Sequence, residues 1–219
     1  PEIDGLRALA VLAVIIYHGE ISIWGNYLTG GFLGVDIFFV ISGYLITSII
    51  YKELKLTNNF SFLNFYKRRA RRILPALFLV IIASTYYAYK VLIPLDYIDL
   101  LKSGISSLFF SSNFYFYFTG IQYGAESNFL KPLLHTWSLS VEEQYYLIFP
   151  LILIITYKYF IKYLRIVVVG IFLISFVFSV IQNQINPSQN FYFIYSRMWE
   201  ILAGSIIAIY EFDNKKKYN

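Results

Sequence analysis

An arginine and a histidine stand eleven positions apart in the first apolar stretch of the sequence, with no charged residue between Arg7 and His18. Eleven residues of helix make about three full turns, so both side chains face the same way, about 16 Å apart along the axis. An imidazole in this position can accept a proton from a hydroxyl group. The structural alternative is that Arg7 pairs with Asp4, one turn earlier, while His18 only ends the apolar stretch.

Asp36 is the carboxylate that the sequence places best to act on His18. It lies one turn inside the apolar run GVDIFFVISGYLI, which follows the run that His18 ends. A neighbouring carboxylate can orient an imidazole and raise its basicity, as general-base chemistry requires. The competing interpretation is that Asp36 only anchors its helix at the membrane interface.

Four arginines are concentrated in the segment YKRRARRILPAL: Arg68, Arg69, Arg71 and Arg72. The planar guanidinium fork suits phosphate groups, so this run is a candidate phosphate site. The same charges would also serve to orient a membrane protein, or to bind the phosphates of lipid headgroups. The sequence favours neither interpretation.

Acidic residues next to apolar runs form the remaining candidates. Glu142 and Glu143 precede a strongly apolar run, and Ser140 with Glu143 fits a helix-capping box, which leaves Glu142 unexplained. Arg197 and Glu200 stand one turn apart near the outer end of the last apolar run, where we interpret them as a structural ion pair.

The composition requires a membrane to position these residues. The chain of 219 residues is 58% hydrophobic and 14% charged, whereas soluble chains are about 45–50% apolar and about 25% charged. Such apolar content excludes disorder, the absence of Cys excludes a disulfide scaffold, and two His residues disfavour structural zinc. The net charge of +5 comes from basic clusters beside apolar runs, a distribution that argues against nucleic-acid binding.

Seven apolar segments are long enough to be candidate spans of about 20 residues: 5–24, 32–51, 73–93, 99–118, 137–157, 165–183 and 192–211. No cleavable signal pattern precedes the first, so we expect it to be retained. The basic block after the second places the N-terminus inside. Segment 99–118 is polar for a lipid-facing helix, and if it dips in and returns, the basic residues at 158–165 and 215–217 stay inside. We therefore predict an all-α polytopic bundle of six full spans plus a re-entrant segment, with seven spans as the alternative.

Five segments, in this order, resemble the membrane acyltransferase family called acyltransferase 3, which includes O-acetyltransferases of bacterial surface glycans. They are PEIDGLRALAVLAVIIYH, GGFLGVDIFFVISGYLI, FYKRRARRILPAL, LLHTWSLSVEEQYYLIFP and FYFIYSRMWEILAG, and they cover essentially the whole chain. The family's Arg-x10-His feature corresponds to Arg7 and His18. Its Arg-x-x-Arg feature corresponds either to Arg68 with Arg71 or to Arg69 with Arg72.

The resemblance implies transfer of an acyl group, usually acetyl from acetyl-CoA, to a hydroxyl of a cell-surface or lipid-linked glycan such as lipopolysaccharide. It implies a multi-pass protein of the bacterial inner membrane, with membrane lipid and a glycan acceptor as partners and no metal. His18 would then act either as a general base or as the carrier of the acyl group. The alternatives are a transporter or channel for an acyl donor, in which buried ionisable residues line a pathway, and a non-catalytic membrane partner.

On this basis we assign roles to the candidates. The catalytic set is His18, Arg7, Asp36, Glu142 and Glu143. The arginines Arg68, Arg69, Arg71 and Arg72 hold the coenzyme, and the acceptor is bound by Asp4, Trp137, Ser138, Arg197 and Glu200. The family domain has about ten spans, so we expect residues 1–219 to form a single transmembrane acyltransferase domain truncated at its C-terminal side, with the remainder of the same protein as a further partner.

Overall fold

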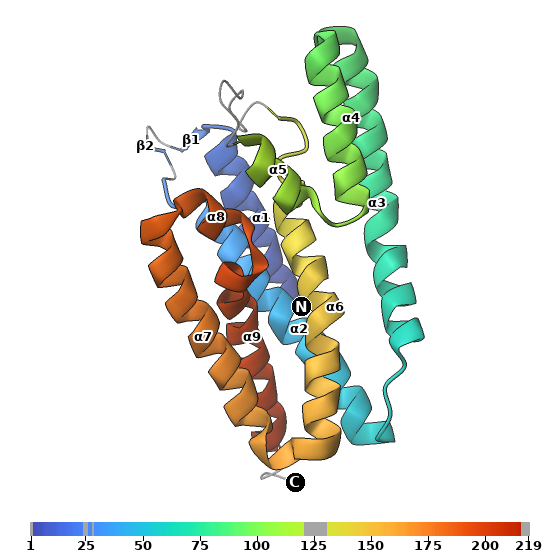
Figure 1. Ribbon diagram of the computed structural model, residues 1–219, viewed down its shortest axis with the longest axis vertical. Helices are drawn as coiled ribbons and strands as arrows, with labels where there is room; N and C mark the ends of the chain where they lie inside the picture. The colour runs from blue at the N-terminus through green and yellow to red at the C-terminus, as the bar shows by residue number, and fades with distance from the viewer. Residues whose placement is uncertain (1, 24–25, 28, 121–130, 216–219) are drawn as a thin grey trace. The chain divides into compact units, whose positions relative to one another are not determined.

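The protein is described by a computed structural model covering residues 2–23, 26–27, 29–120 and 131–215, and it is almost entirely helical (Figure 1). The strands in these residues are β1 (Ser22–Ile23) and β2 (Asn26–Tyr27), which form one short antiparallel pair. The predicted all-α class is therefore confirmed.

The helices follow one another with short connections. They are α1 (Glu2–His18), α2 (Leu33–Thr57), α3 (Phe62–Val91), α4 (Pro94–Leu108), α5 (Ser112–Gly120), α6 (Thr136–Phe160), the 3₁₀ turn η2 (Ile161–Tyr163), α7 (Leu164–Ile185), α8 (Pro187–Tyr192) and α9 (Ile194–Lys215). Among the described residues, three helical stretches are long and apolar enough to cross a membrane: Leu33–Thr57, Phe62–Val91 and Thr136–Ile185. The number of spans remains a prediction.

The chain divides into two compact units. The first contains residues 1–58, 148–180 and 195–219, and the second contains residues 59–147 and 181–194. Helix α6 contributes its first half to the second unit and its second half to the first, and the boundary falls beside Pro150. Each unit is described by itself.

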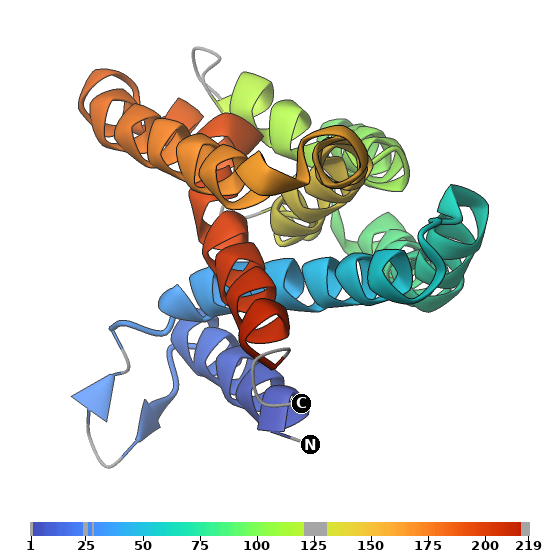
Figure 2. The same ribbon diagram turned by 90° about the horizontal axis from the view of Figure 1, so that it is seen from below.

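In the first unit, glycines on two opposite faces of α2 allow close contact with α1 and α9 (Figure 2). A Cβ on Gly34 would lie 2.5 Å from the carbonyl oxygen of Ala10 in α1, and one on Gly43 would clash with the carbonyl oxygen of Ile201 in α9. Nine residues of helix turn through about 180° beyond full turns, so the two glycines face opposite ways. Small residues at such contacts let membrane helices approach backbone to backbone.

A cluster of polar side chains joins the far ends of the helices in the first unit. Asp213 of α9 accepts hydrogen bonds from Tyr51 at 2.9 Å and Lys55 at 3.1 Å in α2, and from Arg165 of α7 at 2.8 Å. Burial alone would raise the pKa of the Asp213 carboxyl, but the hydrogen bonds from these partners outweigh it and lower the pKa below its usual range. This carboxylate ties three helices together.

In the second unit, α3 and α4 lie side by side, and the chain reverses direction after α4 (Figure 1). Helix α4 ends at Leu108, Phe110 adopts a positive φ of 51°, and α5 begins at Ser112 and leads back. Segment 99–118 is therefore not one continuous helix. A helix, a sharp turn and a returning short helix have the geometry that the re-entrant interpretation requires.

Three of the five serines that made this segment unusual for a lipid-facing helix are buried in the protein: Ser103, Ser107 and Ser112. Ser107 and Thr136 share a hydrogen bond of 2.8 Å, and so do Ser112 and Ser140, in each case joining the turn region to the start of α6. Asn113 is fully buried and donates to the backbone carbonyl of Tyr192 at 3.0 Å. Buried polar groups of this kind are tolerated because each has a partner.

Candidate functional site

His18 is the last residue of α1 and is exposed. Its Nδ1 lies 2.9 Å from the backbone carbonyl oxygen of Val14. A carbonyl oxygen can only accept, so in the neutral form of the ring Nδ1 carries the hydrogen and Nε2 keeps its lone pair. The local helix geometry thus holds the imidazole in the tautomer whose exposed nitrogen can take up a proton or act as a nucleophile.

Arg7 lies on the same helix, as the spacing required. Its Nε atom is buried and has no hydrogen-bond partner among the described residues. A buried guanidinium donor without a partner is costly in a folded protein. Arg7 therefore presents a donor that a bound molecule can satisfy, and this favours a binding role. Asp4 stands exposed in the preceding turn.

Asp36 does not meet His18 in the structure, contrary to the sequence-based expectation. Arg197 in α9 donates from Nη2 to Asp36 Oδ1 at 3.1 Å, and in the described part of the chain no hydrogen bond joins Asp36 to His18. The reason is helical phase. Asp36 follows Gly34 by two residues, about 200° around α2, and Gly34 faces α1, so Asp36 is directed toward α9.

The predicted ion pair of Arg197 and Glu200 is confirmed, and Asp36 joins it as a third member. Arg197 Nη1 donates to Glu200 Oε1 at 2.7 Å while Nη2 holds Asp36. The Glu200 side chain is only 3% exposed and that of Asp36 is 30% exposed. One guanidinium thus bridges two carboxyl groups from different helices. A planar fork with parallel donors suits this arrangement, which Lys could not reproduce.

The four arginines of α3 fall into two groups. They lie within the helix, because α3 begins six residues before Arg68. Arg69 turns inward, and its guanidinium carbon lies 4.6 Å from the centroid of the Tyr146 ring. Arg68, Arg71 and Arg72 are exposed, and their spacing of three and four residues places them on one face. This grouping favours Arg68 with Arg71 as the Arg-x-x-Arg pair.

The capping-box interpretation of Ser140 and Glu143 is wrong. Helix α6 begins at Thr136, so Ser140 lies inside the helix, and its Oγ is bonded to Ser112 instead. The helix starts four residues before Ser140, at Thr136, whose hydroxyl is hydrogen-bonded to Ser107 and Ser112 beside the α4–α5 turn. The role of Glu143 therefore needs another explanation.

Glu142 and Glu143 have different surroundings. Glu142 accepts a hydrogen bond of 2.7 Å from the hydroxyl of Tyr146, one turn later. Glu143 Oε1 is buried without a hydrogen-bond partner among the described residues, and the positive charge of Arg69 acts on this carboxyl. Tyr146 was not among the residues predicted from the sequence, although its spacing of four residues from Glu142 could have identified it.

Trp137 and Ser138, which were assigned to acceptor binding, contact other residues of the protein. Trp137 is 6% exposed, and its ring centroid lies 4.3 Å from that of Phe191. Ser138 donates to the backbone carbonyl of His135 at 3.2 Å. The Trp137 ring packs on Phe191 within the protein, so it does not offer an open face for a sugar. Within the described residues, no group of three or more His, Asp or Glu is placed to hold a metal.

Comparison with known proteins supplies the family. A family model described as an acyltransferase domain matches residues 1–219. The chain is 39% identical over 216 residues to the peptidoglycan O-acetyltransferase OatA of Listeria monocytogenes, covering 95% of this chain and 33% of that protein. It is 38% identical over 215 residues to the putative peptidoglycan O-acetyltransferase YrhL of Bacillus subtilis, with the same coverage.

The O-acetyltransferase OatA of Staphylococcus aureus is 43% identical over 155 residues, which are 70% of this chain and 24% of that protein. The chain thus spans about a third or less of the length of these relatives. No solved structure matches the chain. The family match extends over every candidate residue described above, from Asp4 to Glu200, and the chain belongs to the acyltransferase family.

Proposed function

We propose that this chain is the membrane part of an O-acetyltransferase that moves an acetyl group to a hydroxyl of a cell-wall glycan. The observation that carries the proposal is the exposed His18 imidazole, fixed by the Val14 carbonyl with Nε2 available and sharing a helix face with Arg7. The relatives' names support peptidoglycan, rather than lipopolysaccharide or a lipid-linked glycan, as the acceptor.

We propose acetyl-CoA as the donor. Arg68, Arg71 and Arg72 present guanidinium groups on one exposed face of α3, a chemistry that fits the phosphates of the coenzyme. Arg69 is engaged with Tyr146, so we assign it to the support of this face. On the predicted orientation, the arginines lie on the cytoplasmic side, where a phosphate-rich donor would be available.

The chemistry available to His18 takes two forms. As a general base, Nε2 accepts the proton of the acceptor hydroxyl while the hydroxyl oxygen attacks the acetyl carbon, the carbon–sulfur bond breaks and the thiolate leaves. As a nucleophile, Nε2 first forms the bond to the acetyl carbon while the carbon–sulfur bond breaks and the thiolate leaves. The acceptor oxygen then attacks the acetyl carbon and displaces the imidazole, which takes up the hydroxyl proton. In both mechanisms, the buried Nε of Arg7 donates a hydrogen bond to acetyl-CoA, which lies along the same helix face.

The surroundings of the remaining candidates suggest supporting roles. Asp36, Arg197 and Glu200 fix α2 against α9 close to the α2 terminus. Glu143 supplies a buried acceptor beside Arg69. We place the protein in the bacterial cytoplasmic membrane with its N-terminus inside. Because the relatives extend far beyond the matched part, we propose that further spans of the whole protein complete the site.

The test is acetylation of cell-wall glycan in cells that carry the full-length protein or its His18→Ala variant. Loss of a general base costs about 10²–10⁴-fold in rate, and loss of an acyl carrier abolishes transfer. We expect normal accumulation in the membrane, because Ala at an exposed helix end leaves the packing intact. Tyr17→Phe on the neighbouring residue is the matched control and should stay active.

Acetylation within about tenfold of wild type in His18→Ala would contradict the assignment. A second outcome separates the enzyme from a channel for an acyl donor. If His18→Ala still delivers donor-derived acetyl groups across the membrane while the glycan stays unmodified, the residue performs the transfer. If delivery and modification fail together in a variant that folds normally, the channel function is favoured.

A further inference from the structure

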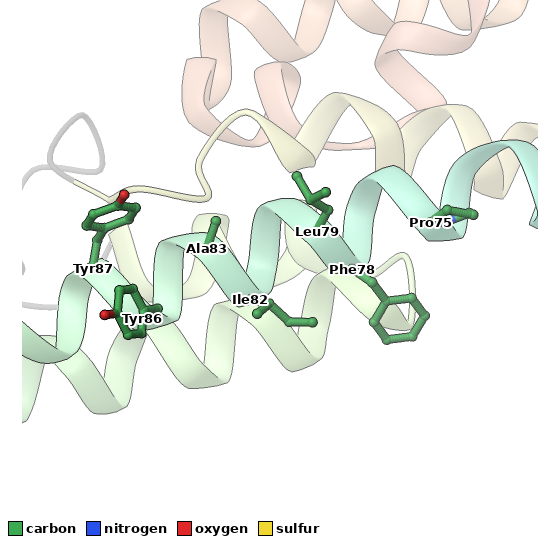
Figure 3. A pocket seen from close by; sticks show the side chains of 7 residues that line it. All are labelled: Pro75, Phe78, Leu79, Ile82, Ala83, Tyr86 and Tyr87. Atoms are coloured by element: carbon green, nitrogen blue, oxygen red, sulfur yellow. The ribbon is translucent and has the colours of Figure 1, made fainter.

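An apolar groove runs along the exposed face of α3. Its volume is about 620 Å³. Seven residues line it, at alternating spacings of three and one positions: Pro75, Phe78, Leu79, Ile82, Ala83, Tyr86 and Tyr87. Figure 3 shows Phe78, Ile82 and Tyr86 along one edge and Leu79 and Tyr87 along the other, with the small Ala83 between them. The only polar atoms of these side chains are the two tyrosine hydroxyls.

The length of the groove matches one leaflet of a bilayer. From Pro75 to Tyr87 the helix rises about 18 Å at 1.5 Å per residue. Half of a hydrocarbon core of about 30 Å is about 15 Å. A single acyl chain lying against α3 would therefore extend over most of the groove.

The groove ends beside a lysine. Lys90 is exposed, its Nζ donates to the hydroxyl of Tyr86 at 3.0 Å, and it lies 4.5 Å from the centroid of the Tyr86 ring. Among the described residues no ion pair joins Lys90 to a carboxylate, whereas Lys131 pairs with Asp99 in the same unit. An ammonium with three donors, one of them used, can still bind the oxygens of a phosphate.

We propose that this groove holds one anionic phospholipid, with an acyl chain along Phe78, Ile82 and Ala83 and the phosphate on Lys90 and Tyr86. Charge complementarity supports this occupant, because the exposed ammonium of Lys90 stands at one end of the groove, one turn beyond Tyr86. Tyrosine and lysine are also the residues that membrane proteins place at headgroup level. On the predicted orientation, the end of α3 lies outside, so the lipid belongs to the outer leaflet.

The test uses the full-length protein in nanodiscs that contain equal amounts of phosphatidylglycerol and phosphatidylcholine, followed by native mass spectrometry of retained lipid. We expect wild type to retain phosphatidylglycerol preferentially. Lys90→Gln should lower this preference about fivefold, the equivalent of one surface cation. Ala83→Phe fills the hollow and should reduce retention of both lipids.

Matched controls exist in the same unit. Lys102→Gln removes an exposed lysine of α4, and Ala76→Phe enlarges an exposed alanine of α3 outside the groove, and neither should change lipid retention. Equal retention in wild type, Lys90→Gln and Ala83→Phe would overturn the proposal. So would a disulfide between a cysteine at position 83 and a second protein segment, since it would show that a helix occupies the groove. Neither result bears on acetyl transfer by His18.

Discussion

At the residue scale, the same residue type serves two purposes in α3. Arg69 is half-buried over the ring of Tyr146, whereas Arg71 and Arg72, two and three residues later, are exposed. Sequence alone identified four equivalent arginines, because a cation–π contact needs a partner 77 positions away that no local spacing reveals. Asp36 illustrates the same limit, since its partner Arg197 is 161 positions away.

Replacing arginine by lysine should therefore have opposite consequences at the two kinds of position. Arg71→Lys with Arg72→Lys keeps the charge but loses the fork, so affinity for acetyl-CoA should fall while thermal stability is unchanged. Arg69→Lys should instead lower stability by about 0.5–1 kcal/mol through the weakened ring contact, with little effect on donor affinity. Calorimetric titration with acetyl-CoA and thermal unfolding in detergent measure the two quantities. An unchanged affinity for acetyl-CoA in the double variant would mean that Arg71 and Arg72 only help to orient the protein in the membrane.

At the scale of elements, hydropathy located the helices well, but polar contacts determined where they begin, end and turn. Helix α3 begins at Phe62, eleven residues before the predicted start of its span, because basic residues are good helix formers although they are not apolar. The break between α4 and α5 could be predicted from the serines, because lipid would not satisfy them. Their partners on α6, Thr136 and Ser140, could not be predicted, since those pairings depend on packing between distant segments.

The polar cluster around Asp213 makes the docking of α9 dependent on pH. Because its hydrogen-bond partners lower the pKa of Asp213, the carboxylate stabilises the fold above the unfolded value of about 3.9, and this stabilisation is lost as the pH falls through the lower folded value. Asp213→Asn should cost about 1–3 kcal/mol at pH 7, and should flatten the decline in melting temperature between about pH 5 and pH 3. Thermal unfolding at several pH values measures both. A variant with the same decline as wild type would assign the acid sensitivity to other carboxyls.

At the scale of the whole molecule, class and family follow from the sequence, whereas the path across the membrane depends on one segment. Apolar content, the basic clusters and five ordered motifs identify a membrane acyltransferase, and the match over residues 1–219 confirms the family. Two structural relations among the candidate residues were predicted correctly: Arg7 and His18 share a helix, and Arg197 pairs with Glu200. Hydropathy measures only the length of an apolar segment. A segment that enters the membrane and returns has nearly the same apolar length as one that crosses, so hydropathy does not distinguish the two paths.

The direction of α6 and everything after it depends on that segment. If α4 and α5 form a re-entrant hairpin, position 160 at the end of α6 lies inside the cell, and if 99–118 crosses, it lies outside. The chain contains no cysteine, so a cysteine introduced at position 160 is the only thiol within residues 1–219 that an impermeant reagent can label. A cysteine at position 22, in the first predicted outer loop, is the positive control.

We expect intact cells to label the cysteine at position 22 and to protect the one at position 160, which should react only after the membrane is opened. The reason is charge: Lys158, Lys162 and Arg165 surround position 160, and basic residues beside span ends resist translocation. If α4 and α5 form a re-entrant hairpin, these residues remain inside, because the chain then returns to the side from which it entered. Labelling of position 160 in intact cells would require a seventh crossing, and α4, the turn and α5 would then have to span the bilayer together despite the reversal at Phe110.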